Sequence, residues 1–299
     1  MKTIAIASGK GGVGKTVIAA NLAAALVDWG HSVLLFDADF GLANVDILFG
    51  VECDKSLKDV VVDGVELRKI ICTGPGEVDL ISGGSGVDEL LDLSDSQLED
   101  VLQQLAKVAR EYDYVIVDTA AGLHPHVLAF TNSADLALFV CTPDPTSLMD
   151  CFVALKMLYR VKPDAKTALL VNQADTASQA EIVFNKLKTI VGQFLSKSVL
   201  YAGAVEWDET VAACSRTCAS LVLTKPKSKP AKQIDELAEW IIDGAGEIEE
   251  EDDDQFSLMQ RLRSAFSFLK RDDGTDDTDD EEESEESDEQ EEDERRTAA

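Results

Sequence analysis

The sequence is short of positive charge. It contains 27 Lys and Arg residues against 57 Asp and Glu residues, which gives a formal net charge of −30 at pH 7. Nucleic-acid phosphates are bound by basic stripes or patches, so this balance argues against DNA or RNA as a partner. Residues 247–299 hold 24 of the acidic and 6 of the basic residues, so they carry −18 and residues 1–246 carry −12. We expect this acidity to provide mainly solubility and self-repulsion.

Long apolar runs are also missing. No run reaches the roughly 20 residues that a membrane-spanning helix needs, and the chain opens with a strand pattern instead of a signal peptide. These absences predict a cytoplasmic protein whose six cysteines are mostly free thiols. Cys214 and Cys218 would lie on adjacent turns of one helix. A metal or iron–sulfur pair is the alternative, although the usual two-residue spacer is absent.

Short apolar runs alternate with helical patterns from the first residue to about Gly246. Such alternation is typical of a mostly parallel sheet with helices on both faces, so we predict an α/β fold. A loop-rich stretch is expected from residue 37 to about 86. The expected strands are residues 3–8, 33–36, 114–117, 136–141, 167–171 and 199–204, and the expected helices are residues 17–29, 94–111, 146–160, 177–195 and 231–243.

Residues 9–16 read Gly-Lys-Gly-Gly-Val-Gly-Lys-Thr and lie between an expected strand and an expected helix. That context supports the P-loop interpretation of the motif. The glycines let backbone N–H groups close around phosphate oxygens, and the following helix N-terminus adds partial positive charge. Lys15 would reach the β- and γ-phosphates of ATP, and the Thr16 hydroxyl would bind Mg²⁺. The predicted nucleotide-binding residues of the motif are Gly11, Gly12, Val13, Gly14, Lys15 and Thr16.

Acidic residues follow two of the expected strands. Asp37 and Asp39 come after residues 33–36, and Asp118 comes after residues 114–117. Ligands of open parallel sheets lie at the carboxyl ends of the strands, so these acids are expected to converge on the P-loop. One carboxylate could organise Mg²⁺ and its waters while another orients the attacking water. The alternative is that each Asp only caps a turn or helix.

Lys10 makes this P-loop similar to the deviant Walker A motif of the MinD/ParA family of ATPases. The resemblance implies that Lys10 crosses to the nucleotide of the partner subunit in an ATP-dependent homodimer, and that Asp39 acts on the hydrolytic water. It also implies that Asp118 is the acid on the Mg²⁺ side and that Asn172 reads the adenine base. The predicted catalytic residues are therefore Lys10, Lys15 and Asp39, and the predicted Mg²⁺ ligands are Thr16 and Asp118.

Within that family the sequence is particularly similar to the flagellar regulators called FlhG, FleN or YlxH. The matching stretches are residues 37–46, 81–86 and 142–147, and the similarity runs from about residue 1 to 245. Many FlhG proteins carry an N-terminal Asp-Gln-Ala motif that stimulates the GTPase FlhF. The chain has no such motif ahead of its first strand pattern, so a MinD-like positioning role gains weight over GTPase activation.

The C-terminal region divides by composition. Residues 1–246 are expected to form the ATPase domain, 247–254 an acidic linker, and 272–299 a disordered acidic tail. Apolar residues recur at near-helical spacing in 255–271, which predicts an interfacial amphipathic helix similar to the membrane-targeting helix of MinD and FlhG proteins. One helix would bind a membrane reversibly, whereas two on an ATP dimer would hold firmly. Docking on the ATPase body or on a protein partner is the alternative.

These features predict a slow, regulatory ATPase, dependent on ATP and Mg²⁺, that dimerises at the inner face of the membrane and regulates flagellar number or placement. Flagellar regulatory proteins are its candidate partners. Two alternatives are a positioning ATPase for another cargo or for cell division, and an iron–sulfur carrier of the related Mrp type. His124 and His126 could bind a metal, although the start of a solvated helix is the simpler interpretation.

Overall fold

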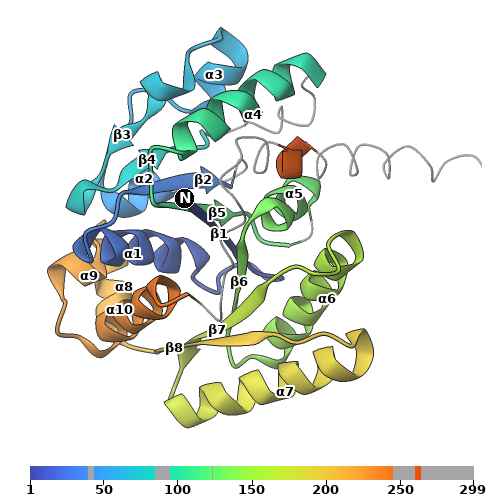
Figure 1. The fold of residues 1–299 in the computed structure, drawn as a ribbon. Helices are drawn as coiled ribbons and strands as arrows, with labels where there is room; N and C mark the ends of the chain where they lie inside the picture. Colours follow the sequence, from blue (N-terminus) through green and yellow to red (C-terminus); the bar gives the residue numbers. More distant parts are fainter. Residues whose placement is uncertain (40–43, 85–94, 123, 245–259, 264–299) are drawn as a thin grey trace, which may run out of the picture.

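A parallel β-sheet forms the centre of the molecule (Figure 1). The computed structural model describes residues 1–39, 44–84, 95–122, 124–244 and 260–263. Its eight strands lie in the order β3-β4-β2-β5-β1-β6-β7-β8, and every pairing is parallel except that of β3 with β4. The strands are β1 Lys2–Ala7, β2 Val33–Ala38, β3 Cys72–Thr73, β4 Asp79–Ile81, β5 Tyr114–Thr119, β6 Leu136–Cys141, β7 Thr167–Ala174 and β8 Leu200–Glu206.

Helices cover both faces of this sheet, which confirms the predicted α/β fold (Figure 1). Helices α1, α2, α8, α9 and α10 contribute to the core on one face, while α3 to α7 contribute to the two clusters on the other. The helices are α1 Lys15–Asp28, α2 Val45–Phe49, α3 Leu57–Asp63, α4 Asp95–Ala109, α5 Pro125–Ser133, α6 Pro145–Val161, α7 Ala177–Leu195, α8 Glu209–Arg216, α9 Leu221–Thr224 and α10 Lys229–Ile242, with short 3₁₀ turns at Leu67–Ile70 and Pro75–Glu77.

The central strands are apolar on both faces because both faces are covered. In β1, Ile4 and Ile6 pack in the cluster beneath α1 and α10, whereas Ala5 and Ala7 face the opposite helices. All four side chains are almost completely buried. A continuous apolar run is therefore the expected signature of such a strand, and it explains why these strands were predictable from the sequence.

Three strands run further than predicted and carry polar residues inside them. Asp37 lies in β2, Asp118 in β5 and Asn172 in β7, each paired with a neighbouring strand. The predicted loop-rich stretch also contains α2, α3, β3 and β4, which are too short to show a clear periodicity. The first residue of the helix expected at 94–111, Ser94, lies outside the described residues.

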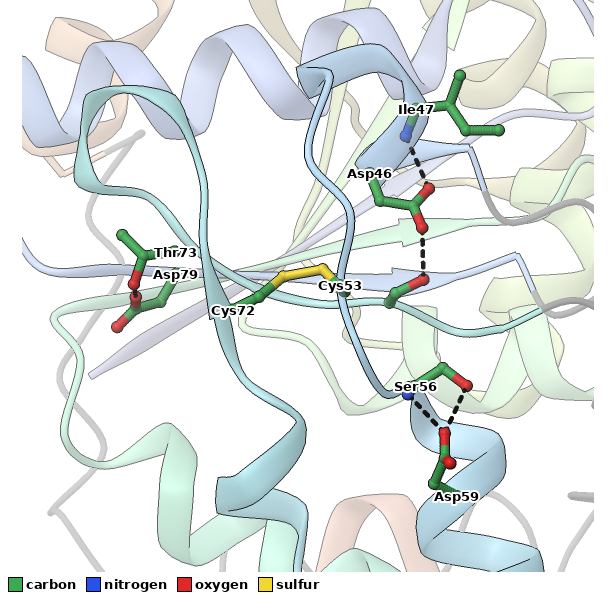
Figure 2. Close-up of a disulfide and its surroundings, with 9 residues drawn as sticks. Asp46, Ile47, Cys53, Ser56, Asp59, Cys72, Thr73 and Asp79 are labelled. Carbon is green, nitrogen blue, oxygen red and sulfur yellow. Dashed lines mark hydrogen bonds between the residues drawn. A yellow bond between two sulfur atoms is a disulfide. The ribbon is translucent and has the colours of Figure 1, made fainter.

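One expectation about the cysteines is wrong, and another is confirmed. Helix α8 ends at Arg216, so Cys218 does not lie on an adjacent helical turn to Cys214; its φ of 51° is left-handed. Four of the six cysteines, Cys141, Cys151, Cys214 and Cys218, are free, so the thiols are mostly free as predicted; Cys53 and Cys72 form a disulfide that was not predicted. Spacing in the sequence could not reveal this pair, because β3 brings Cys72 beside the segment that follows α2 (Figure 2).

Part of the predicted amphipathic helix is docked on the ATPase body. Residues 260–263 are helical and lie beside α5 (Figure 1). Leu262 is 1% exposed and belongs to the cluster that contains Phe36 and Phe130. Arg261 Nη1 pairs with Asp135 Oδ1 at 2.6 Å, just beyond the end of α5. The rest of 255–271, the linker and the acidic tail lie outside the described residues. Within the described parts of the chain, no helix is long and apolar enough to span a bilayer.

Candidate nucleotide site

The P-loop connects the end of β1 to the start of α1. Gly12 and Gly14 have φ values of 76° and 93°, a left-handed conformation that glycine adopts without steric cost. Gly14 is the N-cap residue of α1, so the free N–H groups of that helix open toward the loop. This arrangement of backbone donors is suited to an anionic phosphate.

Two glycines of the loop are held close to other elements. A Cβ built on Gly9 would lie 2.1 Å from the backbone carbonyl oxygen of Asp150 in α6. A Cβ on Gly14 would lie 2.5 Å from Nδ2 of Asn172 at the end of β7. The loop is thus packed against both α6 and β7, and a side chain at either glycine would force these elements apart.

Lys15 lies at the start of α1 and is 8% exposed. Its Nζ donates a hydrogen bond to Ser8 Oγ at 3.0 Å. Burial lowers the pKa of Lys15, and the negative charges of Asp118 and Asp39 oppose that shift. Among the described residues, the hydrogen-bond partner of the ammonium group is therefore one neutral hydroxyl, in a position where a phosphate would offer a stronger partner. Ser8 was not singled out from the sequence.

Asp37 and Asp118 form a buried pair of carboxylates at the ends of β2 and β5. The two residues are directly opposite in the parallel register and are 0% and 1% exposed. Burial raises the pKa of Asp118 to about 8, with a further contribution from Asp37 and opposing ones from Thr16 and Lys15. Burial also raises the pKa of Asp37 to about 6, against the hydrogen bonds that it accepts.

A divalent cation fits beside these acids. Asp118 Oδ1 is buried and has no hydrogen-bond partner among the described residues, which is costly for a carboxylate oxygen. The Thr16 hydroxyl bonds to the same side chain. Carboxylate and hydroxyl oxygens are the ligands that Mg²⁺ prefers. The convergence of Thr16, Asp118 and Lys15 predicted from the sequence is present, and their assigned roles remain predictions.

Asp37 holds the segment that carries Asp39. Its Oδ1 accepts the backbone N–H of Asp39 at 3.1 Å, and its Oδ2 accepts those of Asn44 at 2.9 Å and Val45 at 3.1 Å. The carboxylate thereby ties both ends of the loop between β2 and α2. The sequence predicted that Asp37 lies at this edge but did not assign it this positioning role. A buried Asp at the end of a strand, followed by Asn44 at a helix start, was the available signal.

Lys10 is directed away from Lys15, toward α6. Its Nζ lies 2.8 Å from Asp144 Oδ2 and 2.6 Å from Thr146 Oγ1. Hydrogen bonds from Lys10 and Thr146 lower the pKa of Asp144 to about 2. Both Lys10 and Asp144 are nearly half exposed, so the pair is accessible from solvent. Asp144 is also the N-cap residue of α6, which places the partner of Lys10 on a rigid element.

Asn172 joins the P-loop to β7. Its Nδ2 donates to the carbonyl oxygen of Val13 at 2.8 Å, and its Oδ1 accepts the backbone N–H of Gln173. Asn172 is 7% exposed and lies beside Gly14. The predicted adenine-reading residue is thus located at the nucleotide loop, while its contact with a base remains a prediction.

A P-loop at the amino end of a helix, with buried acids on two adjacent parallel strands, defines this protein as a P-loop nucleotide-binding protein. Residues 1–171 match the family model described as AAA domain. The chain is 34% identical over 241 residues to the antiactivator FleN of Pseudomonas aeruginosa, covering 81% of this chain and 86% of that protein. It is 33% identical over 255 residues to the flagellum site-determining protein YlxH of Helicobacter pylori, covering 84% and 86%. The chain belongs to the MinD/ParA family of ATPases.

Solved structures share the fold. The cell division ATPase MinD of Pyrococcus furiosus superposes with a TM-score of 0.66 at 24% identity, covering 81% of this chain and 98% of that one. MinD of Pyrococcus horikoshii, solved with Mg-ADP, gives the same TM-score and identity, with 84% and 99% covered. These structures show the fold; membership of the MinD/ParA family of ATPases, shown by the relatives above, makes the chain an ATPase that uses ATP with Mg²⁺, as predicted.

The predicted metal alternatives gain no support from the side chains described. Across those parts of the chain no group of three or more His, Cys, Asp or Glu side chains is arranged to hold a metal ion. Cys214 is buried, and its Sγ lies 3.6 Å from Thr224 Oγ1, whereas Cys218 is exposed. His124 is the N-cap residue of α5, which is the helix start predicted for it.

Proposed function

We propose that this ATPase regulates the number or placement of flagella as a dimerising switch that alternates between a free state and a membrane-bound state. The proposal is supported by the similarity to FleN and YlxH over most of the chain. The observation that carries the switch is the burial of Leu262 in the same core cluster as Phe36, the residue immediately before Asp37. The C-terminal helix thus shares a core cluster with the strand that leads into the nucleotide site.

The homodimer is proposed to form when ATP draws Lys10 away from Asp144 and toward the partner's nucleotide. The ion pair with Asp144 holds Lys10 on its own subunit, so its release is part of the cost of dimerisation. Asp39 then acts on the water beside the phosphate, while Lys15, Thr16 and Asp118 hold ATP and Mg²⁺. Gly11, Gly12, Val13 and Gly14 surround the phosphates, and Asn172 reads the base. Slow hydrolysis lets the dimer persist long enough to act.

The pKa of Asp144 provides a direct test of the dimer proposal. Carboxyl carbon NMR titrations of Asp144 would be compared in the free protein, in Lys10→Ala, and in the wild type with Mg²⁺ and a non-hydrolysable ATP analogue. In the free wild type the pKa is expected at about 2. It should rise toward an ordinary value in both other samples, because Lys10 is absent or has moved. A pKa that stays at about 2 in an ATP-analogue dimer would contradict the movement of Lys10.

Membrane binding is proposed to use the apolar residues of 255–271 after they leave the ATPase body. A single large apolar side chain contributes roughly 1.5–3 kcal/mol when fully buried, so one helix binds a bilayer reversibly. Two helices on one dimer gain effective concentration and hold more firmly. The domain division at residues 1–246, 247–254, 255–271 and 272–299, and a location at the cytoplasmic face of the membrane, belong to this proposal.

The membrane step is tested by sedimentation with anionic liposomes in ATP and in ADP. The full-length chain is compared with a chain truncated after Asp254, with nucleotide binding measured on both. Pelleting that requires both ATP and residues 255–299 supports the switch. If ATP binds and the full-length chain stays in the supernatant, the membrane step is excluded and the docked helix is a fixed part of the body.

A further inference from the structure

The cysteines of this protein differ sharply in reactivity. Cys141 and Cys151 are buried between β6 and α6, and burial raises the pKa of Cys141 to about 12 and that of Cys151 well above its usual value. Cys214 is also buried. Since the thiolate is the reactive form, Cys141 and Cys151 are chemically inert. Cys53 and Cys72, in contrast, are both half-buried and already joined as a disulfide.

The disulfide joins two elements that are distant in the sequence. Cys53 follows α2, and Cys72 lies in the antiparallel strand β3 at the outer edge of the sheet (Figure 2). Their Cα atoms are 5.8 Å apart, within the usual range for disulfides, and 19 positions separate them in the sequence. Both side chains rest against the core cluster beneath α1.

Helix α2 is fixed to the rest of the molecule at three points. At its start, Asp37 accepts the backbone N–H groups of Asn44 and Val45. In its first turn, Asp46 Oδ2 accepts a hydrogen bond at 3.1 Å from the hydroxyl of Ser82, the residue after β4. The other Asp46 oxygen accepts the N–H of Ile47 (Figure 2). The third point is the disulfide, which lies four residues beyond the end of the helix.

The turn after β3 also packs against the end of α2. A Cβ on Gly74 would lie 3.5 Å from Phe49 and 3.8 Å from Val51. Phe49 is 3% exposed and anchors α2 in the core. Because of this packing, α2 can move relative to the sheet edge only if it slides along the β3 hairpin. The bond between Cys53 and Cys72 prevents that sliding.

We infer that Cys53 and Cys72 form a reversible redox modification site, oxidised by a low-molecular-weight disulfide of the glutathione class, and that the bond restrains α2 and slows ATP turnover. The connection to turnover runs through Asp37, which bonds to Asp39 on one side and to the start of α2 on the other. Oxidation ties the far end of α2 to the sheet edge, and reduction leaves it held by noncovalent contacts alone.

The reaction is a thiol–disulfide exchange in two steps. The thiolate of one cysteine attacks a sulfur of the small disulfide, forms a mixed disulfide and expels one small thiolate. The thiolate of the second cysteine then attacks the protein sulfur of that mixed disulfide, closing the protein bond and expelling the second small thiolate. The two cysteines lose two electrons and two protons, and the small disulfide gains both to become two thiols.

The test uses the full chain with Cys218→Ser, which removes the exposed thiol beside Gly50 as a competitor for exchange. Protein is equilibrated in buffers of different ratios of reduced to oxidised glutathione, quenched with acid and alkylated, and peptides containing Cys53 and Cys72 are quantified. One reversible transition between linked and unlinked peptides is expected. Peptides that remain unlinked in the most oxidising buffer, or linked in the most reducing one, would contradict the proposal that Cys53 and Cys72 form a reversible redox site.

The coupling is measured on oxidised and reduced samples without any membrane, so it is independent of the flagellar proposal. Amide hydrogen exchange in residues 44–53 is expected to be about tenfold faster after reduction, because the covalent bond no longer restricts local opening of this segment. ATP turnover should rise severalfold in the same sample. Equal exchange and equal turnover in the two states would make the disulfide a static cross-link and refute the coupling.

Cys53→Ser and Cys72→Ser provide matched variants. Each leaves its partner cysteine unable to form the bond, so both should behave like the reduced protein at every glutathione ratio. Urea unfolding of each variant, compared with the reduced parent, identifies any change in global stability. If the hydrogen exchange and ATP turnover of the two serine variants responded to glutathione as those of the parent do, a different cysteine would be responsible and the assignment to this pair would be wrong.

Discussion

At the scale of single residues, the site is dominated by the burial of Asp118. Its carboxylate is buried beside Asp37, and one of its oxygens has no hydrogen-bond partner in the part of the chain that the structure describes. Raising its pKa to about 8 means that the folded protein holds a proton which the unfolded chain would release above about pH 4. Without metal, this residue therefore lowers stability as the pH rises.

The first prediction concerns Asp118→Asn in protein free of Mg²⁺ and nucleotide. The variant should match the wild type near pH 4 and become more stable than it as the pH rises toward 8, by an amount on the order of a few kcal/mol, because only the wild type must deprotonate a buried acid. Urea unfolding at a series of pH values measures the difference. A difference in stability that does not change with pH would show that neighbouring groups already offset the cost of burying the Asp118 carboxylate. Added Mg-ATP should stabilise the wild type more than the variant.

The second prediction contrasts two glycines of the P-loop. Gly9→Ala places a methyl group against the backbone of Asp150 and should cost about 2–3 kcal/mol of the unfolding free energy, because α6 must shift. The methyl group of Gly12→Ala would lie in open space, so this substitution should lower the unfolding free energy only through the positive φ at this position, by about 1 kcal/mol. Urea unfolding without nucleotide separates the two. Equal losses would mean that loop strain, and not the contact with α6, sets the requirement for glycine.

Much of the nucleotide site could be predicted from residue identity alone. The P-loop motif located Lys15 and Thr16, and the acids after apolar runs located Asp37 and Asp118, because parallel strands bring their carboxyl ends to one edge. The partner of Lys10 could not be predicted in this way. Asp144 is 134 positions away, and only the packing of α6 beside the P-loop brings the two together.

At the scale of elements, long and strongly apolar segments were predictable and short ones were not. Helix α7 and strand β6 match their predicted limits, since their patterns run for several periods or are bounded by polar residues. Strands β3 and β4 have two and three residues, which carry no periodicity. Their place in the sheet is decided by the pairing of β4 with β2 and of β3 with β4, and by the contact of their turn with α2, which are tertiary effects.

The third prediction concerns the docking of the C-terminal helix. Asp135→Asn removes the charge that holds Arg261, while its side-chain oxygen can still accept the N–H of Thr3. A partly buried ion pair contributes about 1–2 kcal/mol to docking, so its loss should weaken docking roughly tenfold. Liposome sedimentation in ADP should then show more bound protein than for the wild type.

Glu99→Gln is the matched control for that variant. Its partner Arg263 is largely exposed, and the two atoms are 3.3 Å apart, so solvent screens the pair and little effect is expected. If both variants behaved like the wild type, docking would depend on Leu262 alone. If both released the helix equally, general surface charge, and not the Asp135 contact, would control it.

At the scale of the whole molecule, charge is distributed very unevenly along the chain. Residues 272–299 contain 17 acidic and 2 basic residues, directly after a segment proposed to approach anionic lipid. Fixed negative charges within a Debye length of about 8 Å oppose that approach at physiological salt. If residues 255–271 bind lipid as proposed, the acidic segment is expected to lower their affinity for an anionic membrane.

The fourth prediction follows from that expected effect. A chain truncated after Arg271 should bind anionic liposomes in ATP about tenfold more tightly at low salt, since each basic residue of the helix contributes about 1 kcal/mol when it is not opposed. The gain should shrink as salt is added and vanish on neutral lipid. Sedimentation at three salt concentrations measures both trends. A gain that is independent of salt and lipid charge would point to a steric effect of the tail.

The shared core cluster of Leu262 and Phe36 has a consequence for the membrane as well as for the protein. Phe36 precedes Asp37, so this cluster links the docked helix to the segment that carries the nucleotide-site acids. Binding free energies obey reciprocity: if ATP favours release of the helix by some factor, capture of the helix by lipid must tighten ATP binding by the same factor. The bilayer would then act as an allosteric ligand of the ATPase, and a lipid surface would lower the ATP concentration at which the protein switches.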